Sequence, residues 1–185
     1  ELGQFADAER ELRALLTEEP EEPAGHFALA QVLEHREHYD EAETAYERAH
    51  ELDPEGYPLP MRMSRKAFEE AVREAAASLP DELSDHLQEL PVIVQDLPGS
   101  EALDADDGDL VSPGVLGLYV GQSLREESVF DASDTPRGIY IYQRNLEHAC
   151  HTHEELVEEI ATTLYHELGH YLGLDEEDLE ERGVD

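Results

Sequence analysis

Apolar residues recur at helical spacing in the first part of the chain, and one stretch repeats another at a fixed offset. The segments that begin at Phe5 and Tyr39 align at an offset of 34 residues. The matched pairs are Phe5 and Tyr39, Ala8 and Ala42, Leu12 and Tyr46, Leu15 and Ala49, and Pro20 and Pro54. A fixed period of apolar positions, closed each time by a proline, predicts stacked helical hairpins.

The segment between the two matched stretches supplies a further helix, with Leu29, Ala30 and Leu33 at its packing positions. Together the three segments resemble tetratricopeptide repeats, with one complete repeat preceded by half of another. The resemblance implies a helical unit over residues 1–56. At least three such repeats are usually needed for independent stability, so we expect this unit to be truncated or to pack on the domain after it. The turn-rich residues 53–60 mark a domain boundary.

The second domain, residues 61–185, mixes helical spacing with short apolar runs. Helices are predicted over 64–79, after Pro80, and from about His153 to Leu172. Strands are predicted over 91–94, 115–120 and 138–143. Polar loops are predicted over 98–113 and 123–137. Long helices combined with a few short strands predict an α+β fold.

The last long helix carries the candidate chemistry. Thr152 and Glu155 form a capping-box pattern at its start, and Gly173 is a left-handed stop at its end. At 100° per residue, His166 and His170 fall on a face opposite the apolar stripe. Two imidazoles one turn apart can reach one ion, as the zinc motif H-E-x-x-H requires. The alternative is two solvated histidines on an acidic helix.

The sequence HELGHYLGLDEED, together with the segment RGIYIYQRNLEHACHTHEELVEEIATTLY before it, resembles the small bacterial zincin-like metallopeptidase family. The resemblance covers residues 61–185 and implies a compact domain with a short sheet over the motif helix. It implies that His166 and His170 bind Zn²⁺ through ring nitrogens. It also implies that Glu167 is the general base, which takes a proton from water and passes it to the leaving amine.

A third metal ligand is expected in the acidic segment after Gly173. The metzincin-like spacing puts this ligand at Glu176, where the family usually has Asp. Asp175 is the second choice and Asp178 the third. The alternative is that these carboxylates only solvate the end of the helix.

The resemblance also implies a substrate-binding strand. In zincins an edge strand just before the motif helix pairs with an extended peptide, which predicts this role for residues 138–143. Tyr140 and Tyr142 share one face of that strand and are candidates to line the cleft, or else to fill the core. Tyr171 is a candidate donor to the developing oxyanion, with packing as the alternative.

A second group of metal-binding residue types, His148, Cys150, His151 and His153, lies in a predicted loop before the helix cap. The sequence contains no second cluster that would complete a tetrahedral site with it. We therefore interpret Cys150 as a buried small side chain. As the only cysteine, it cannot form an intrachain disulfide.

The composition bears on which classes of partner the protein can bind. The chain has 47 acidic and 12 basic residues and a formal net charge of -35, with Lys66 as its single lysine. Such a charge repels phosphate, which argues against nucleic acid and anionic membrane as partners. Without an apolar run of membrane-spanning length or a visible signal peptide, a cytoplasmic location is expected. A halophilic source and an ordinary acidic protein remain alternative explanations of the charge.

These patterns predict a zinc-dependent peptidase with a peptide or protein substrate. The repeat segment is expected to bind a protein partner or the substrate chain. The alternative is a non-catalytic adaptor in which zinc is structural and the repeats carry the function.

Overall fold

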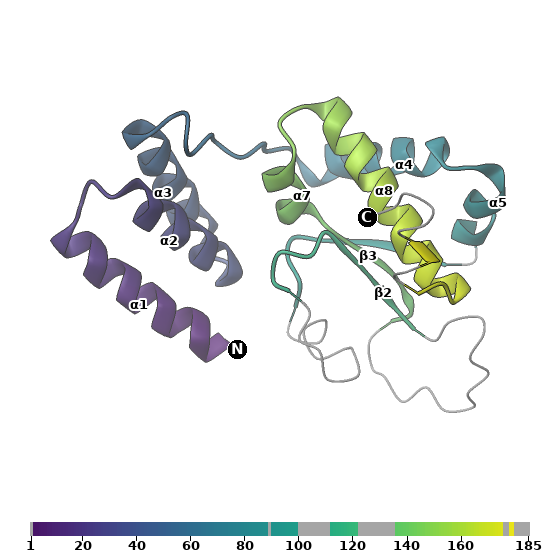
Figure 1. Cartoon of the computed structure of the whole chain (residues 1–185), viewed down its shortest axis with the longest axis horizontal. Coiled ribbons are helices and arrows are strands. Elements are labelled where there is room, and N and C mark those ends of the chain that lie inside the picture. The colour runs from purple at the N-terminus through teal and green to yellow at the C-terminus, as the bar shows by residue number, and fades with distance from the viewer. Residues whose placement is uncertain (1, 89, 100–111, 122–135, 176–177, 180–185) are drawn as a thin grey trace. The chain divides into compact units, whose positions relative to one another are not determined.

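The computed structural model describes residues 2–88, 90–99, 112–121, 136–175 and 178–179. The chain divides into two compact units, residues 1–60 and residues 61–185 (Figure 1). Each unit has its own apolar core. The two units are therefore described separately.

Three helices form the first unit: α1 (Leu2–Glu18), α2 (Pro23–His35) and α3 (Tyr39–Leu52). Helix α2 packs against both of the others (Figure 1). The alanines Ala30, Ala42 and Ala49 have no exposed surface, because small side chains let the helix axes approach closely. This arrangement is the half repeat followed by a complete repeat that the sequence predicts.

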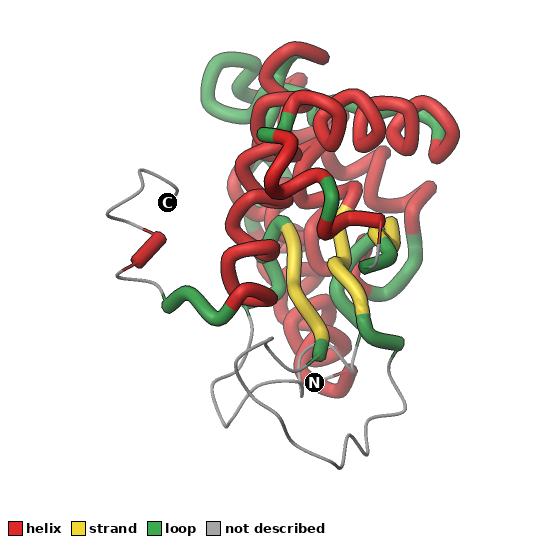
Figure 2. The backbone as a smooth tube through the Cα atoms, turned by 90° about the vertical axis from the view of Figure 1, so that its right-hand side faces the viewer, coloured by secondary structure: helices red, strands yellow, loops and turns green. Residues whose placement is uncertain are grey.

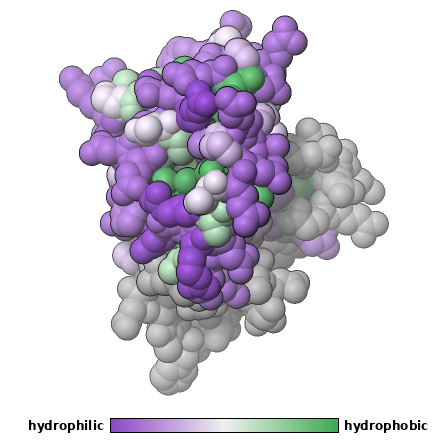
Figure 3. Space-filling model, turned by 90° about the vertical axis from the view of Figure 1, so that its left-hand side faces the viewer, coloured by the Kyte–Doolittle hydropathy of each residue, from purple (hydrophilic) through white to green (hydrophobic). Residues whose placement is uncertain are grey.

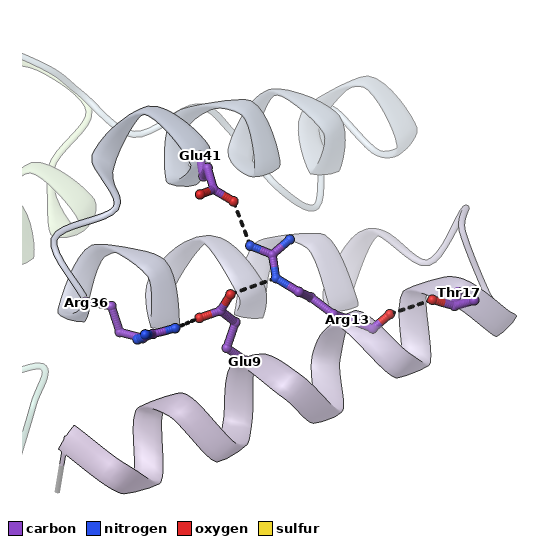
Figure 4. A network of polar contacts seen from close by, with 5 residues as sticks. All are labelled: Glu9, Arg13, Thr17, Arg36 and Glu41. Carbon is purple, nitrogen blue, oxygen red and sulfur yellow. Dashed lines mark hydrogen bonds and ion pairs between the residues drawn. The ribbon is translucent and has the colours of Figure 1, made fainter.

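A network of charged side chains joins the three helices of the first unit (Figure 4). Arg13 on α1 donates to Glu9 through Nε (2.7 Å) and to Glu41 on α3 through Nη2 (2.6 Å). Arg36, at the C-terminal end of α2, forms an ion pair with the other oxygen of Glu9. Most of the Glu9 side chain is buried, so its charge is balanced by two guanidinium groups rather than by water.

The second unit combines helices with a small sheet (Figure 2). Its helices are α4 (Arg65–Ser78), α5 (Asp81–Ser84), the 3₁₀ turn η1 (His86–Gln88), α7 (Gln143–Ala149) and α8 (His153–Leu172), and its strands are β1 (Val92–Gln95), β2 (Gly117–Val120) and β3 (Gly138–Tyr142). The fold is α+β, as predicted. The predicted loops at 98–113 and 123–137 lie largely outside the described residues.

The strand order corrects one expectation. The sheet runs β1-β3-β2, with β3 parallel to β1 and antiparallel to β2. Residues 138–142 therefore form the central strand of the described sheet and not an edge. Both sides of its backbone are used in pairing, so it has no edge to offer a substrate peptide.

The core of the second unit lies between the sheet and the pair α4 and α8. Ile139 and Ile141 of β3 point into this core, where they meet Phe68 of α4 and Ile160 and Leu164 of α8. All five side chains have no exposed surface. One face of α8 is thereby committed to packing, which leaves its opposite face for chemistry.

Helix α7 is a second difference from the sequence prediction, which had a strand to residue 143 and then a loop. Glu147 on α7 is 2% exposed and makes the helix part of the core. Its Oε1 accepts hydrogen bonds from the N–H of Met63 (3.1 Å) and from Gln143 Nε2 (2.7 Å). Its Oε2 forms an ion pair with Arg62 Nη1 (3.2 Å). Glu147 thus fastens the start of the second unit to the element just before α8.

No helix within the described residues is both long and apolar enough to cross a membrane. Hydrophilic side chains cover most of the face shown in Figure 3, with a smaller apolar patch near its centre.

Replacing Glu147 by Ala tests this connection. The change leaves three donors without their shared acceptor, so the free energy of unfolding should fall by about 2–4 kcal/mol. Urea unfolding followed by tyrosine fluorescence measures this change. The exposed Glu69→Ala on α4 is the control and should stay within about 0.5 kcal/mol of the parent. Equal stability of the two variants would show that Glu147 holds nothing in place.

Candidate metal centre

Both ends of helix α8 are fixed by local hydrogen bonds, as the sequence predicts. Thr152 Oγ1 accepts from the N–H of Glu155 (3.1 Å), and the Glu155 carboxylate accepts from the N–H of Thr152 (3.3 Å). At the other end Gly173 has a φ of 79°, a left-handed conformation that glycine adopts without strain. With both ends fixed, each residue between them keeps a defined rotational position on the helix.

The two histidines of the motif converge on one point. The Nε2 atoms of His166 and His170 are 2.9 Å apart, and the two rings meet at an interplanar angle of 77°. Two imidazole nitrogens bound to one tetrahedral zinc at about 2.0–2.1 Å stand roughly 3.3 Å apart. A small opening of the pair would reach that separation. The two side chains therefore fit as ligands of one zinc ion.

The described residues contain no group of three His, Cys, Asp or Glu side chains arranged to hold a metal. Glu176, the first choice for the third ligand, lies outside the described residues. Asp175 and Asp178 are described, and they cap one another. Asp175 Oδ1 accepts from the N–H of Asp178 (2.9 Å), and Asp178 Oδ2 accepts more weakly from the N–H of Asp175 (3.5 Å). Both alternative ligands thus have a local structural role.

Leu179, which follows the acidic segment, makes a close contact with α8 at Gly169. Leu179 has no exposed surface and lies on the helix where Gly169 has no side chain. A Cβ at residue 169 would stand 2.4 Å from Leu179 Cδ2. The absent side chain lets Leu179 pack directly against α8.

Glu167 lies between α8 and strand β2, where it is 7% exposed. Its Oε2 accepts a hydrogen bond of 2.6 Å from the backbone N–H of Tyr119. The charged carboxylate is thereby buried with a backbone donor, which offsets part of its lost hydration. The sequence did not reveal this partner, because 48 residues separate the two groups.

Gly117 allows β2 to approach α8 this closely. A Cβ at residue 117 would stand 2.5 Å from Thr163 Cγ2 and 3.1 Å from the carbonyl oxygen of Tyr140. Thr163 has a stiff β-branched side chain on a buried face of the helix, so it cannot easily give way. The glycine therefore brings the strand to the distance at which Tyr119 reaches Glu167.

Strand β2 is the edge of the described sheet on the side of the motif helix. The carbonyl of Leu116 accepts a hydrogen bond from the N–H of Tyr142. The backbone groups of every second residue from Leu116 along β2 therefore point toward β3. The backbone groups of Gly117 and Tyr119, the residues that alternate with these, point to the outer side of β2. This outer side includes the donor that holds Glu167.

A pocket of ≈ 240 Å³ opens between β2 and α8. Its walls are Val115, Leu116 and Gly117 on the strand side and Glu159, Thr162, Thr163, His166 and Glu167 on the helix side. The pocket thus reaches from one histidine of the pair to a point two helical turns earlier.

Three tyrosines named from the sequence are packed in the interior. Tyr140 is 4% exposed and Tyr142 is fully buried, and both lie with Val120 on the sheet face turned away from α8. Their burial supports the core alternative over a place in a substrate cleft. Tyr171 is 3% exposed and its ring contacts those of Tyr119 and His86, which supports the packing alternative.

The second group of metal-binding residue types does not form a site among the described residues. His148 lies on α7, and His153 Nε2 is 3.4 Å from Glu74. Burial first, and then the charges of Glu159 and Glu155, raise the pKa of the Cys150 thiol to about 11. The thiol therefore stays protonated at neutral pH, whereas metals and electrophiles take the thiolate.

Substituting Gly117 by Ala tests the contact between β2 and α8. The added methyl collides with Thr163 Cγ2, so the free energy of unfolding should fall by about 1–3 kcal/mol. The matched variant Thr163→Ser removes the methyl that is struck. Added to Gly117→Ala, it should restore part of the stability, giving a coupling above about 0.5 kcal/mol in a double-mutant cycle. Strict additivity of the two changes would contradict the contact.

Comparison with known proteins finds a relationship for each unit. The family model for the tetratricopeptide repeat matches residues 1–57. The family model for zincin-like metallopeptidase matches residues 87–184, more than half of the chain, and includes β1–β3 and all of α8. A search of curated proteins finds no match. The long match carries the identification: the chain belongs to the zincin-like metallopeptidase family.

Proposed function

We propose that the protein hydrolyses peptide bonds with the help of a zinc ion held by His166 and His170. The observation that carries the proposal is the convergence of the two Nε2 atoms, 2.9 Å apart, on a helix whose next acidic side chain is buried and oriented. A solvated pair of histidines on an acidic helix would not need a capped helix end, a buried Glu167 and a glycine-lined approach to a strand.

A zinc ion bound there would polarise a peptide carbonyl and make a water molecule more acidic. Glu167 then has the role of general base. Its carboxylate accepts the proton of the attacking water and delivers it to the nitrogen of the leaving amine. The N–H of Tyr119 holds one carboxylate oxygen, which fixes the orientation of the group.

The substrate backbone is proposed to pair with β2, the strand that replaces β3 in this role. The outward N–H and carbonyl of Gly117 and the outward carbonyl of Tyr119 can form hydrogen bonds with an extended peptide, while the N–H of Tyr119 stays with Glu167. Such pairing would lay the peptide beside α8 with its backbone close to His166 and Glu167. Main-chain hydrogen bonds of this kind make few demands on the substrate's side chains.

The third zinc ligand is proposed to be Glu176. The carboxylates of Asp175 and Asp178 accept hydrogen bonds from one another's backbone N–H groups. This favours Glu176, one of the two residues between them, as the ligand. The contact of Leu179 with Gly169 supports a ligand from the acidic segment, because Leu179 lies three residues after Glu176 in the sequence and packs on α8.

The repeat unit is proposed to bind a protein partner or the substrate chain. A groove of ≈ 510 Å³ lies among α1, α2 and α3, with Leu29 and Leu33 on its floor and Arg13 and Arg48 among its walls. The match to the tetratricopeptide repeat supports this role. A non-catalytic adaptor with a structural zinc is the competing hypothesis. Removing the proton acceptor Glu167 discriminates between the peptidase and the adaptor.

Glu167→Gln provides that discrimination. The variant keeps the shape of the side chain and an oxygen for Tyr119, so zinc content and affinity should match the parent. Without a proton acceptor, kcat for peptide hydrolysis should fall by about 10²–10⁴-fold. Zinc is measured by mass spectrometry, and cleavage with a pool of quenched fluorescent peptides. Glu158→Gln, an exposed change on the same helix, is the control. Undiminished cleavage by the Glu167 variant would refute the mechanism.

The third ligand is tested by removing each carboxylate in turn. Glu176→Ala should weaken zinc binding by at least about tenfold, measured by competition with a chromophoric chelator. Asp175→Ala and Asp178→Ala should chiefly loosen the C-terminal turn and change zinc affinity less. If Asp175→Ala abolished zinc binding while Glu176→Ala did not, the ligand would be Asp175.

A further inference from the structure

The pocket between β2 and α8 has a chemical character that bears on which substrates fit. Its strand side is apolar, formed by Val115, Leu116 and Gly117. Its helix side is formed by Glu159, Thr162, Thr163, His166 and Glu167, and Thr163 turns its methyl Cγ2 toward Gly117. An apolar wall with a carboxylate at one end is suited to a side chain with an aliphatic stem and a polar end.

The two hydroxyls are not free donors, and that of the exposed Thr162 offers an acceptor. Thr162 Oγ1 donates to the carbonyl of Glu158 (3.1 Å), and Thr163 Oγ1 donates to the carbonyl of Glu159 (2.8 Å). Each hydroxyl hydrogen is therefore used on the helix backbone, and the oxygen lone pairs remain. A ligand group that only donates hydrogen bonds matches this wall, and the ammonium and guanidinium groups are of that kind.

Glu159 supplies an acidic group to the pocket in addition to Glu167. The carboxylate is half-buried, and no ion pair is formed with it in the described part of the chain. Its charge is also felt by Cys150, whose pKa it helps to raise. A carboxylate left without a cation beside apolar surface attracts one more strongly than a fully solvated carboxylate does.

The position of Glu159 relative to the candidate metal centre suits a long side chain. Seven residues separate Glu159 from His166 on one helix face, which corresponds to about 10.5 Å along the axis. A lysine side chain spans roughly 6 Å from Cα to Nζ, and arginine slightly more. A residue whose Cα lies within a few ångströms of the reacting carbonyl would therefore bring its cationic end to Glu159.

We infer that this pocket selects a Lys or Arg side chain of the substrate, next to the bond to be cleaved, and that Glu159 is the residue that determines this specificity. The inference rests on the proposed peptidase function and names its substrate class. The net charge of -35 adds a long-range contribution, since it draws cationic peptides to the surface and repels acidic ones.

The test compares zinc-loaded protein on quenched fluorescent peptides that differ at a single position on either side of the cleaved bond. The varied residue is lysine, norleucine, which has the same stem without the ammonium group, or glutamate. At one of the two positions the parent should cleave the lysine peptide at least tenfold faster in kcat/KM than the norleucine peptide. Glu159→Gln should lose most of that ratio while retaining the cleavage of the norleucine peptide.

Glu158→Gln is the matched control, since it removes the same charge from the adjacent, exposed position. It should keep the lysine preference and thereby separate the pocket from the general acidity of the surface. A preference that falls equally in both variants would overturn the role of Glu159. Equal cleavage of lysine and norleucine peptides by the parent would overturn the specificity while leaving the peptidase function intact. Failure of the zinc-loaded parent to cleave any peptide would refute the proposed function, and this inference with it.

Discussion

The close approach of strand β2 to helix α8 at Gly117 is the contact on which the candidate site depends. It places a backbone donor against Glu167 and closes one wall of the pocket beside His166. If β2 lay further from α8 by the width of one side chain, the Glu167 carboxylate would be in water and would have no fixed orientation. The missing side chain at one position thus couples the sheet to the helix that carries the motif.

Helix α8 meets two requirements that usually conflict. Its apolar face, with Ile160, Leu164 and Leu168, is buried without exposed surface, which gives the helix a rigid support. Its other face carries polar groups that must stay reachable, and His166 and His170 are only half-buried there. The capping box and Gly173 keep α8 helical up to both ends. The residues of each face therefore keep their positions around the helix axis.

Charge is handled differently inside the molecule and on its surface. In a chain of net charge -35, two arginines balance buried carboxylates, Arg36 beside Glu9 and Arg62 beside Glu147. Others, such as Arg10, Arg48 and Arg73, pair with exposed carboxylates. Glu159 in the pocket has no such partner among the described residues, and Glu167 receives a neutral backbone donor. An unbalanced carboxylate in a partly enclosed site is a feature that favours a cation, whether from a metal or from a substrate.

The sequence by itself determined the elements whose signals are local. The capped helix and the pair of histidines one turn apart follow from residues a few positions apart, and the repeat follows from a local helical pattern that recurs after 34 residues. Only the tertiary structure decided that β3 is central, that Tyr140 and Tyr142 are buried, and that Tyr119 holds Glu167. The physical reason is that strand order and buried partners depend on contacts between residues distant in the chain. Short apolar runs show that strands exist, but not which strand becomes the edge.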